Sequence, residues 1–163
     1  MQENKLLEGK KVLIVDDEQD VLDVLEQMLP MCDVSKASNF EGAKKLLEDE
    51  HFDMAILDIM GVDGYELLRI ANEKGIIAVM LTAHALTPNN IIRSFKEGAA
   101  SYLPKEELAN IVTFLNEILE AKRKGKNPWW RWLERWASFY DKKFGSGWQD
   151  EHKDFWERFK YYT

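Results

Sequence analysis

The stretch VLIVDDEQD at positions 12–20 sets four β-favouring apolar residues directly before three acids. The apolar run 12–15 is typical of a buried strand. Asp16, Asp17 and Glu18 follow it without a turn residue between. Adjacent carboxylates repel each other, and burying them without a partner is costly. We therefore expect either that these side chains point into water or that a positive group lies beside them.

The composition predicts a soluble globular protein of 163 residues, enough for one domain with a core and a small appendage. The first eleven residues are polar and charged, which is unlike a signal peptide, and no apolar run is long enough to span a bilayer. The single cysteine, Cys32, cannot form an internal disulfide. These features predict a cytoplasmic location.

The charge and the aromatic residues divide the chain near Gly125. The net charge of −7 separates into about −9 before Lys126 and +2 from Lys126 onward, and all six tryptophans lie after Gly125. We predict one domain over residues 8–124 and an aromatic-rich helical extension over residues 125–163. An acidic main domain argues against nonspecific binding to nucleic acid.

Short apolar runs alternate with helical patterns along the first domain. The spacing of apolar residues predicts strands at 11–15, 34–37, 54–57, 77–81 and 100–103, with a helix after each. Ser38 and Glu41 resemble a capping box that begins the second helix, and Pro88 suits the first turn of the fourth. This alternation predicts an α/β domain with a parallel sheet, in which function lies beyond the carboxyl ends of the strands.

Polar and charged residues stand at those strand ends. Asp16 and Asp17 follow the first strand, Asp58 the third, Thr82 the fourth and Lys105 the fifth. Carboxylates gathered at one sheet edge form an oxygen-rich pocket that suits a hard divalent cation such as Mg²⁺. The cation would offset the repulsion between the carboxylates, and the lysine would add a second positive charge.

This arrangement resembles the receiver domain of two-component response regulators over roughly residues 10–124. The resemblance rests on the order and spacing of four fragments: VDDE at 15–18, ILDIM at 56–60, LTA at 81–83 and YLPK at 102–105. It implies a doubly wound, five-stranded parallel sheet in the order 2-1-3-4-5, which is the flavodoxin-like fold.

The resemblance also implies a role for each matching residue. Asp58 would be the phosphoacceptor, and Mg²⁺ would be held by Asp16, Asp17, Asp58 and the backbone carbonyl of Met60. Phosphoryl transfer depends mainly on positioning and on neutralising the oxygens of the group transferred. The phosphoryl oxygens would be contacted by Thr82 and Lys105.

Tyr102 would be the aromatic switch that couples the site to the outer face of the last strand. Two local features differ from the usual family pattern. The loop DIMGVDG at 58–64 is short and lacks a proline, and Pro104 precedes Lys105 instead of a proline following it. The short loop bears most directly on the carbonyl of Met60 as a metal ligand.

The resemblance implies a phosphorelay protein that receives its phosphoryl group from a histidine kinase or a phosphotransfer protein. It would be a signalling protein rather than an enzyme, with self-catalysed phosphorylation and dephosphorylation. An output partner or a second copy would bind through the C-terminal helices or the face of the fourth and fifth elements. One alternative is a metal-dependent phosphohydrolase with an aspartyl nucleophile, although such enzymes tend to carry Asp-x-Asp at the first strand. Another alternative is a degenerate receiver that only binds partners, against which the intact site residues count.

The sequence of the extension predicts a helical hairpin. Asn127 and Pro128 suit the start of a helix whose stripe includes Trp129, Trp132 and Trp136, and FGSG at 144–147 ends it. A second aromatic helix would follow. The aromatic residues could pack on each other and on the receiver, or they could form a partner or dimer surface. The extension lacks a clear basic recognition helix, which argues against DNA binding.

Overall fold

The computed structural model describes residues 5–83 and 87–129. Five strands alternate with helices within these residues. The strands are β1 (Lys11–Val15), β2 (Asp33–Ala37), β3 (Met54–Asp58), β4 (Ile77–Thr82) and β5 (Ser101–Pro104). The helices are α2 (Gln19–Met28), α3 (Phe40–Asp49), α4 (Gly64–Glu73), α5 (Pro88–Lys96), a 3-10 helix η1 (Lys105–Asn110) and α6 (Ile111–Arg123). Each predicted strand is confirmed to within one residue at either end.

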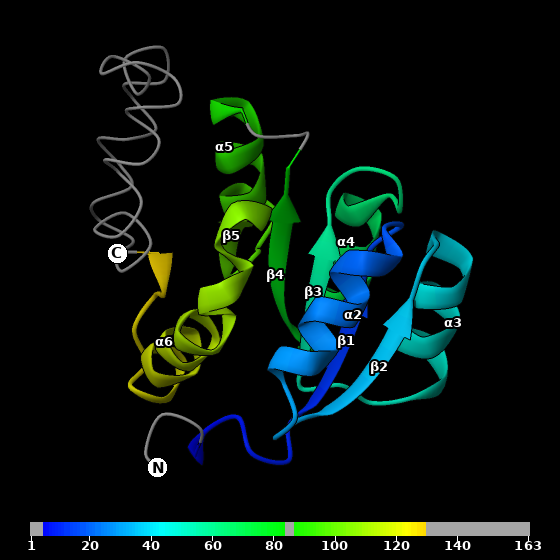
Figure 1. Cartoon of the computed structure of the whole chain (residues 1–163). Coiled ribbons are helices and arrows are strands. Elements are labelled where there is room, and N and C mark those ends of the chain that lie inside the picture. The colour runs from blue at the N-terminus through cyan, green and yellow to red at the C-terminus, as the bar shows by residue number, and fades with distance from the viewer. Residues whose placement is uncertain (1–4, 84–86, 130–163) are drawn as a thin grey trace.

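The five strands form one parallel sheet in the order β2-β1-β3-β4-β5, which confirms the predicted fold class and strand order. Helices α2 and α6 cover one face of the sheet, and α3, α4 and α5 cover the other (Figure 1). In the described part of the chain, no helix has both the length and the apolar character needed to cross a bilayer. Of the predicted helical extension over residues 125–163, only residues 125–129 are described, and the rest of the predicted hairpin lies outside the described residues.

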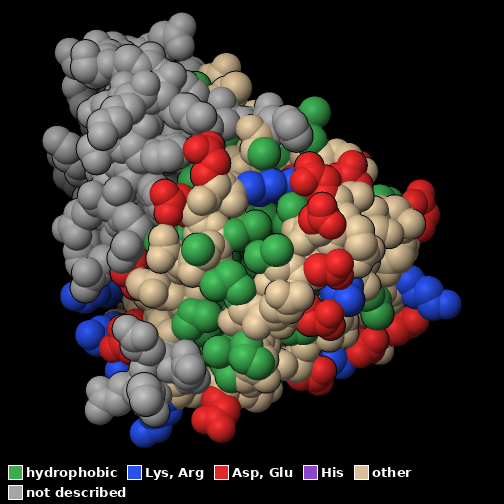
Figure 2. Space-filling view, viewed as in Figure 1, with side chains coloured by type: hydrophobic (Ala, Val, Ile, Leu, Met, Phe, Trp, Pro, Cys, Tyr) green, Lys and Arg blue, Asp and Glu red, His purple; other side chains and the backbone are tan. Residues whose placement is uncertain are grey.

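The face formed by α2 and α6 carries two kinds of side chain in separate places. Figure 2 shows a band of hydrophobic side chains between the two helices and acidic side chains near the end of the sheet where the strands finish. Met28 of α2 and Val112 and Leu119 of α6 are partly buried against the core. The acidic end is where the candidate site residues gather.

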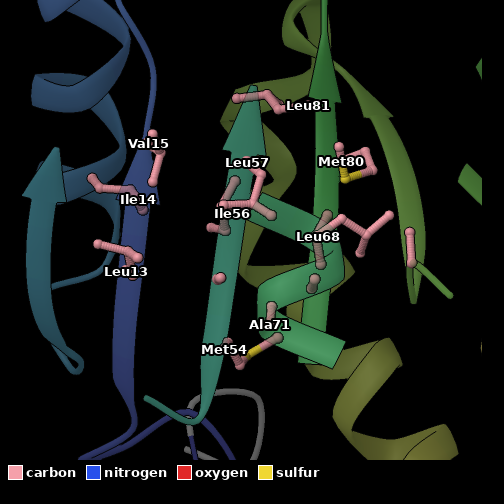
Figure 3. Close-up of a cluster of buried hydrophobic side chains, with 14 of the residues drawn as sticks. Leu13, Ile14, Val15, Met54, Ile56, Leu57, Leu68, Ala71, Met80 and Leu81 are labelled. Atoms are coloured by element: carbon pink, nitrogen blue, oxygen red, sulfur yellow. The ribbon is translucent and has the colours of Figure 1, made fainter. Parts of the chain in front are cut away.

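The central strands are buried on both sides. Every residue of β3 is buried, and the residues of β1 from Val12 to Val15 are at most 1% exposed. Figure 3 shows Leu68 and Ala71 of α4 pointing toward the sheet beside β3 and β4. A parallel sheet covered on both faces requires such continuous apolar runs. Burial of β1 from both sides therefore explains the apolar run at residues 12–15.

The start of α3 differs from the prediction by one residue. Asn39, not Ser38, is the N-cap, because Asn39 has an extended backbone and its side-chain oxygen accepts from the backbone N–H of Gly42 at 2.8 Å. Glu41 is therefore the second helical residue and is not in the capping-box position. At α5 the expectation is confirmed, since Pro88 is the first residue and the Thr87 side chain accepts from the backbone N–H of Asn90.

The last helix begins later than the apolar pattern suggests. Leu108 lies in the 3-10 helix η1, and the α-helix starts only at Ile111. The backbone of Glu107 departs from helical geometry, with φ −107° and ψ 18°. The apolar spacing covered both segments because 3-10 and α-helical turns differ little over one turn. This break leaves Lys105 directly at the end of β5.

Candidate functional site

The register of the parallel strands sets the candidate residues at one edge of the sheet. Asp58 is the last residue of β3, opposite Leu81 of β4 and one position beyond the residue that pairs with Val15 of β1. Thr82 ends β4 opposite Pro104, the last residue of β5. The residues that follow β1 and β5 therefore emerge at the same edge as Asp58 and Thr82.

Lys105 lies at the centre of this edge. Its ammonium nitrogen is 2.9 Å from Oδ2 of Asp16, 3.4 Å from Oδ1 of Asp58 and 3.6 Å from Oε1 of Glu18. The side chain of Lys105 is only 9% exposed. Asp16 also accepts a hydrogen bond from the backbone N–H of Glu18 at 2.9 Å. Three carboxylates thus share one ammonium, so this cluster holds more negative than positive charge.

Burial and the neighbouring charges shift the pKa values of the three groups. Burial, and next the charge of Asp16, raise the pKa of Asp58 to about 6, although Lys105 opposes that rise. Burial also raises the pKa of Asp16, against its contacts with Lys105 and the Glu18 backbone. Burial alone would lower the pKa of Lys105, but its acidic partners outweigh burial and raise it. A further cation at this edge would stabilise the ionised carboxylates.

A group of acidic oxygens at the end of β1 fits such a cation. Ligand atoms from Asp16, Asp17 and Glu18 all lie within 4.8 Å of one another. Carboxylate oxygens are the ligands that hard divalent cations take. Glu18 was missed as a candidate ligand by the sequence reasoning. Its place in the acidic run was the available signal, but an acid at a helix start is usually read as a cap, and this side chain makes no capping hydrogen bond.

The short loop after Asp58 packs closely on the acidic residues. Gly61 has a left-handed backbone, with φ +84°, and a Cβ placed there would collide with the Asp17 carboxylate. A Cβ on Gly64 would collide with the carbonyl oxygen of Asp58. The side chain of Met60 is 54% exposed beside this loop. The backbone carbonyl of Met60 stays a predicted ligand.

Thr82 and Tyr102 lie together beneath the site. Both side chains are buried, at 1% and 0% exposure. Burial raises the pKa of Tyr102. The predicted switch residue is therefore inside the protein, on the strand next to the one that Thr82 ends.

Comparison with protein families and curated proteins gives one consistent result. The family model described as response regulator receiver domain matches residues 12–116. The two-component response regulator ARR12 of Arabidopsis thaliana is 33% identical over 130 residues, which cover 73% of this chain and 22% of the relative. ARR10 of the same plant is 35% identical over 114 residues, or 63% of this chain and 20% of the relative. The chain thus spans about a fifth of the length of these relatives.

Solved structures agree with the sequence matches. A CheY-like response regulator receiver domain protein from Methanospirillum hungatei JF-1 has a TM-score of 0.65 at 29% identity, covering 72% of this chain and 98% of that one. A putative response regulator from Chloroflexus aurantiacus J-10-fl has a TM-score of 0.61 at 30% identity, covering 69% and 99%. The similarity therefore extends over almost the whole of both solved chains.

Proposed function

Because the chain belongs to the response regulator receiver domain family, we propose that Asp58 accepts a phosphoryl group from a histidine kinase or a phosphotransfer protein. The observation that carries this proposal is the contact of one nearly buried ammonium, Lys105, with both Asp16 and Asp58. Family membership itself indicates a signalling protein. The donor, the dependence on Mg²⁺ and the cytoplasmic location belong to the proposal.

The transfer would form a bond between an Asp58 carboxylate oxygen and phosphorus, while the bond from phosphorus to the donor's imidazole nitrogen breaks. The electron pair of the broken bond stays on the imidazole. With a pKa of about 6, Asp58 is largely ionised at neutral pH, as a nucleophile must be. Lys105 offsets the charge of the incoming group, and the Thr82 hydroxyl can donate to a phosphoryl oxygen.

The residues present fit a divalent cation. We propose that Asp16, Asp17 and Asp58 hold Mg²⁺, with the carbonyl of Met60 as a further ligand. The clustered oxygens of Asp16, Asp17 and Glu18 support this, as does the raised pKa of Asp58. When bound, Mg²⁺ would supply charge neutralisation for the phosphoryl oxygens. In self-catalysed phosphorylation, the Asp58 carboxylate would attack a small donor such as acetyl phosphate and release acetate. In self-catalysed dephosphorylation, water would attack the aspartyl phosphate, which releases inorganic phosphate and restores the carboxylate.

The two alternatives are less well supported. A phosphohydrolase with an aspartyl nucleophile tends to carry Asp-x-Asp at the first strand, whereas β1 is followed by Asp16, Asp17 and Glu18, and the family model that matches is the receiver domain. A degenerate receiver would lack part of the site. In this chain the acids, Thr82 and Lys105 lie at one edge of the sheet.

The direct test is incubation with acetyl phosphate and Mg²⁺, followed by intact mass. The wild-type protein should gain one phosphoryl group. Asp58→Asn should gain none, and Asp17→Asn should need more Mg²⁺. The matched control is Asp53→Asn, one residue before the start of β3, which should label like the wild type. Labelling of Asp58→Asn to the wild-type level would refute the assignment.

For the output, we propose that the C-terminal extension signals through protein–protein contacts and is tied to the α5–β5 side of the receiver by Trp129. The indole of Trp129 is 2% exposed, and its Nε1–H donates to the Ala99 carbonyl at 2.7 Å. Its ring meets Phe95 edge to face, with centroids 5.4 Å apart. Asn127 accepts from the Trp129 backbone N–H, as a helix cap would. These contacts support docking of the first turn of the extension on the receiver.

Sedimentation with and without acetyl phosphate tests this output. Trp129→Ala removes the ring, whereas Trp129→Phe keeps an aromatic ring and removes only the indole hydrogen bond. We expect the Ala variant to keep phosphorylation of Asp58 and to change self-association or partner binding, with a smaller change for the Phe variant. If wild type and both variants sediment alike in each state, the extension serves packing alone.

A further inference from the structure

Tyr65, the second residue of α4, cross-links that helix to α5. Its side chain is 8% exposed, and its hydroxyl oxygen lies 2.9 Å from Oδ1 and 3.1 Å from the carbonyl oxygen of Asn90. The same hydroxyl is 3.3 Å from the side-chain oxygen of Ser94, which is fully buried. The guanidinium of Arg93 lies 3.8 Å from the centre of the Tyr65 ring. All of these partners belong to α5.

The first turn of α5 is fixed by the same network. The Asn90 amide nitrogen donates to the Thr87 hydroxyl at 3.0 Å, while its oxygen faces Tyr65. The Thr87 hydroxyl also accepts from the Asn90 backbone N–H as the cap of α5. Loss of the Tyr65 hydroxyl would therefore free the side chain that helps to hold this cap.

The other side of Tyr65 leads to the phosphoacceptor. Its neighbour Gly64 packs so closely on Asp58 that a Cβ would lie 2.9 Å from the Asp58 carbonyl carbon and from Cα of Ile59. The Gly64 backbone N–H also donates to the Ile59 carbonyl at 3.3 Å. A shift of the backbone at Asp58 would therefore be passed directly to the start of α4, and so to Tyr65.

We propose that Tyr65 is a positioning residue that couples the Asp58 loop to α5 through α4. This route is separate from the one through Thr82 and Tyr102, which reaches α5 from β4 and β5. The inference rests on the proposed function, because the coupling would respond to phosphorylation of Asp58. The position of α5 would then depend on two buried tyrosines, Tyr65 and Tyr102.

Asn72 provides a matched control at the other end of the same two helices. Its side-chain nitrogen donates to the Glu97 carbonyl at 2.6 Å, so it also links α4 to the end of α5. It lies two turns away from Gly64, however, and does not adjoin the Asp58 loop. A purely structural helix clamp would make Tyr65 and Asn72 equivalent, whereas the proposed coupling makes them different.

The experiment is hydrogen exchange of the α5 amides in the full chain, with Mg²⁺ alone and with Mg²⁺ plus beryllium fluoride as the phosphoryl mimic. The variants are Tyr65→Phe, Ser94→Ala and the control Asn72→Ala. Without the mimic, each variant should speed α5 exchange by between about two-fold and ten-fold, the range a net hydrogen-bond contribution gives. The mimic-induced change should shrink at least by half in Tyr65→Phe and Ser94→Ala, and should persist in Asn72→Ala.

The outcomes separate the coupling from the proposed function. Fluorine NMR of the wild type shows directly whether beryllium fluoride binds at the site. If it binds and Tyr65→Phe keeps the full α5 response, or if Asn72→Ala loses it equally, the coupling is refuted while the phosphoacceptor assignment stands. If it does not bind to the wild type, the proposed function fails, and the coupling fails with it. Ser94→Ala carries the test if Tyr65→Phe does not fold.

Discussion

Strands β1 and β3 have charged side chains at both ends, but the two ends differ in how these side chains are paired and how far they are exposed. At the amino ends, the Lys11 ammonium lies 2.5 Å from the Glu50 carboxylate and 5.1 Å from the centre of the Phe52 ring. Asp53 accepts from the backbone N–H of Lys11 at 2.8 Å. The ion pair is partly exposed, with side chains 30% and 37% accessible. The ammonium and the carboxylate of this pair have opposite charges, and both remain in contact with water.

At the carboxyl ends, the charges are buried and mismatched. Asp16 is fully buried and Asp58 is 4% exposed, yet both share Lys105 with Glu18. Burial of unbalanced carboxylates costs stability, so a chain selected only for stability would not need them. The difference teaches that the two edges are built differently: the amino edge pairs its charge within reach of water, whereas the carboxyl edge holds excess negative charge, which the proposed Mg²⁺ would offset.

Removing the lysine from the carboxyl edge should give the largest single loss of stability. Lys105→Met leaves Asp16 and Asp58 buried without their shared cation, and should lower the free energy of unfolding at pH 7 by about 3 kcal/mol. Lys11→Met breaks a half-exposed pair and should cost at most about 1 kcal/mol. Urea unfolding without divalent metal measures both. Equal losses in the free energy of unfolding would contradict the inference that the acids at the carboxyl edge depend on Lys105 to offset their charge.

Removing one acid from each edge should give effects of opposite sign. Asp58→Asn removes a charge whose pKa is raised from 3.8 to about 6 and should stabilise the metal-free protein at pH 7 by about 3 kcal/mol, since one pKa unit corresponds to about 1.4 kcal/mol. Asp53→Asn weakens a hydrogen bond to Lys11 and should cost about 1 kcal/mol. Thermal unfolding in a chelator tests this. A loss of stability in Asp58→Asn would contradict it.

The pH dependence of that difference gives a finer test. The pKa of Asp58 is about 6 in the folded protein, against 3.8 for an unperturbed aspartate, so between these values the folded state binds more protons than the unfolded state. The contribution of Asp58 to stability is therefore greatest below about pH 4 and falls as the pH rises through about 6. Wild type should lose stability relative to Asp58→Asn over this range and run parallel above it. A constant difference from pH 4 to 7 would show that Asp58 titrates normally.

Much of the carboxyl edge was predictable from the sequence, because parallel strands end at one edge and each apolar run ends at a polar residue. Asp16, Asp58, Thr82 and Lys105 could be assigned to that edge from order alone. The sequence could not show that Lys105 contacts Asp16 more closely than Asp58, since this depends on how η1 begins. The roles of these residues in phosphoryl transfer stay predictions.

Other features depend on contacts that no local pattern encodes. The indole of Trp129 meets the carbonyl of Ala99, thirty residues earlier in the chain, and only the tertiary fold brings them together. Tyr65 fits the apolar stripe of its helix, so its spacing gives no sign of the polar bonds to Asn90 and Ser94. Glu18 stands directly before α2, so its position in the sequence indicates a helix cap and gives no sign of its contact with Lys105. Periodicity identifies which face is buried, but not which polar atoms meet there.

The smallest effects are expected at two glycines, Gly61 and Gly75, and comparing them distinguishes backbone strain from contact with the acidic cluster. Gly61 and Gly75 both have left-handed backbones, with φ +84° and +72°. A Cβ on Gly61 would collide with the Asp17 carboxylate, whereas nothing lies within 4 Å of a Cβ on Gly75. Replacing either by Ala should cost about 1 kcal/mol of stability, the penalty of that backbone region for a residue with a side chain.

Only Gly61→Ala should also displace Asp17, and it should therefore weaken Mg²⁺ binding, by about ten-fold if the metal depends on that carboxylate. Isothermal titration with Mg²⁺ measures the affinity, and urea unfolding in a chelator confirms that the two variants pay a similar backbone cost. Gly75→Ala should bind Mg²⁺ like the wild type, since it lies at the far end of α4 from the acids. If both variants bind Mg²⁺ like the wild type, Asp17 is not held in place by the loop, and the carboxyl edge owes its metal affinity to the buried acids alone.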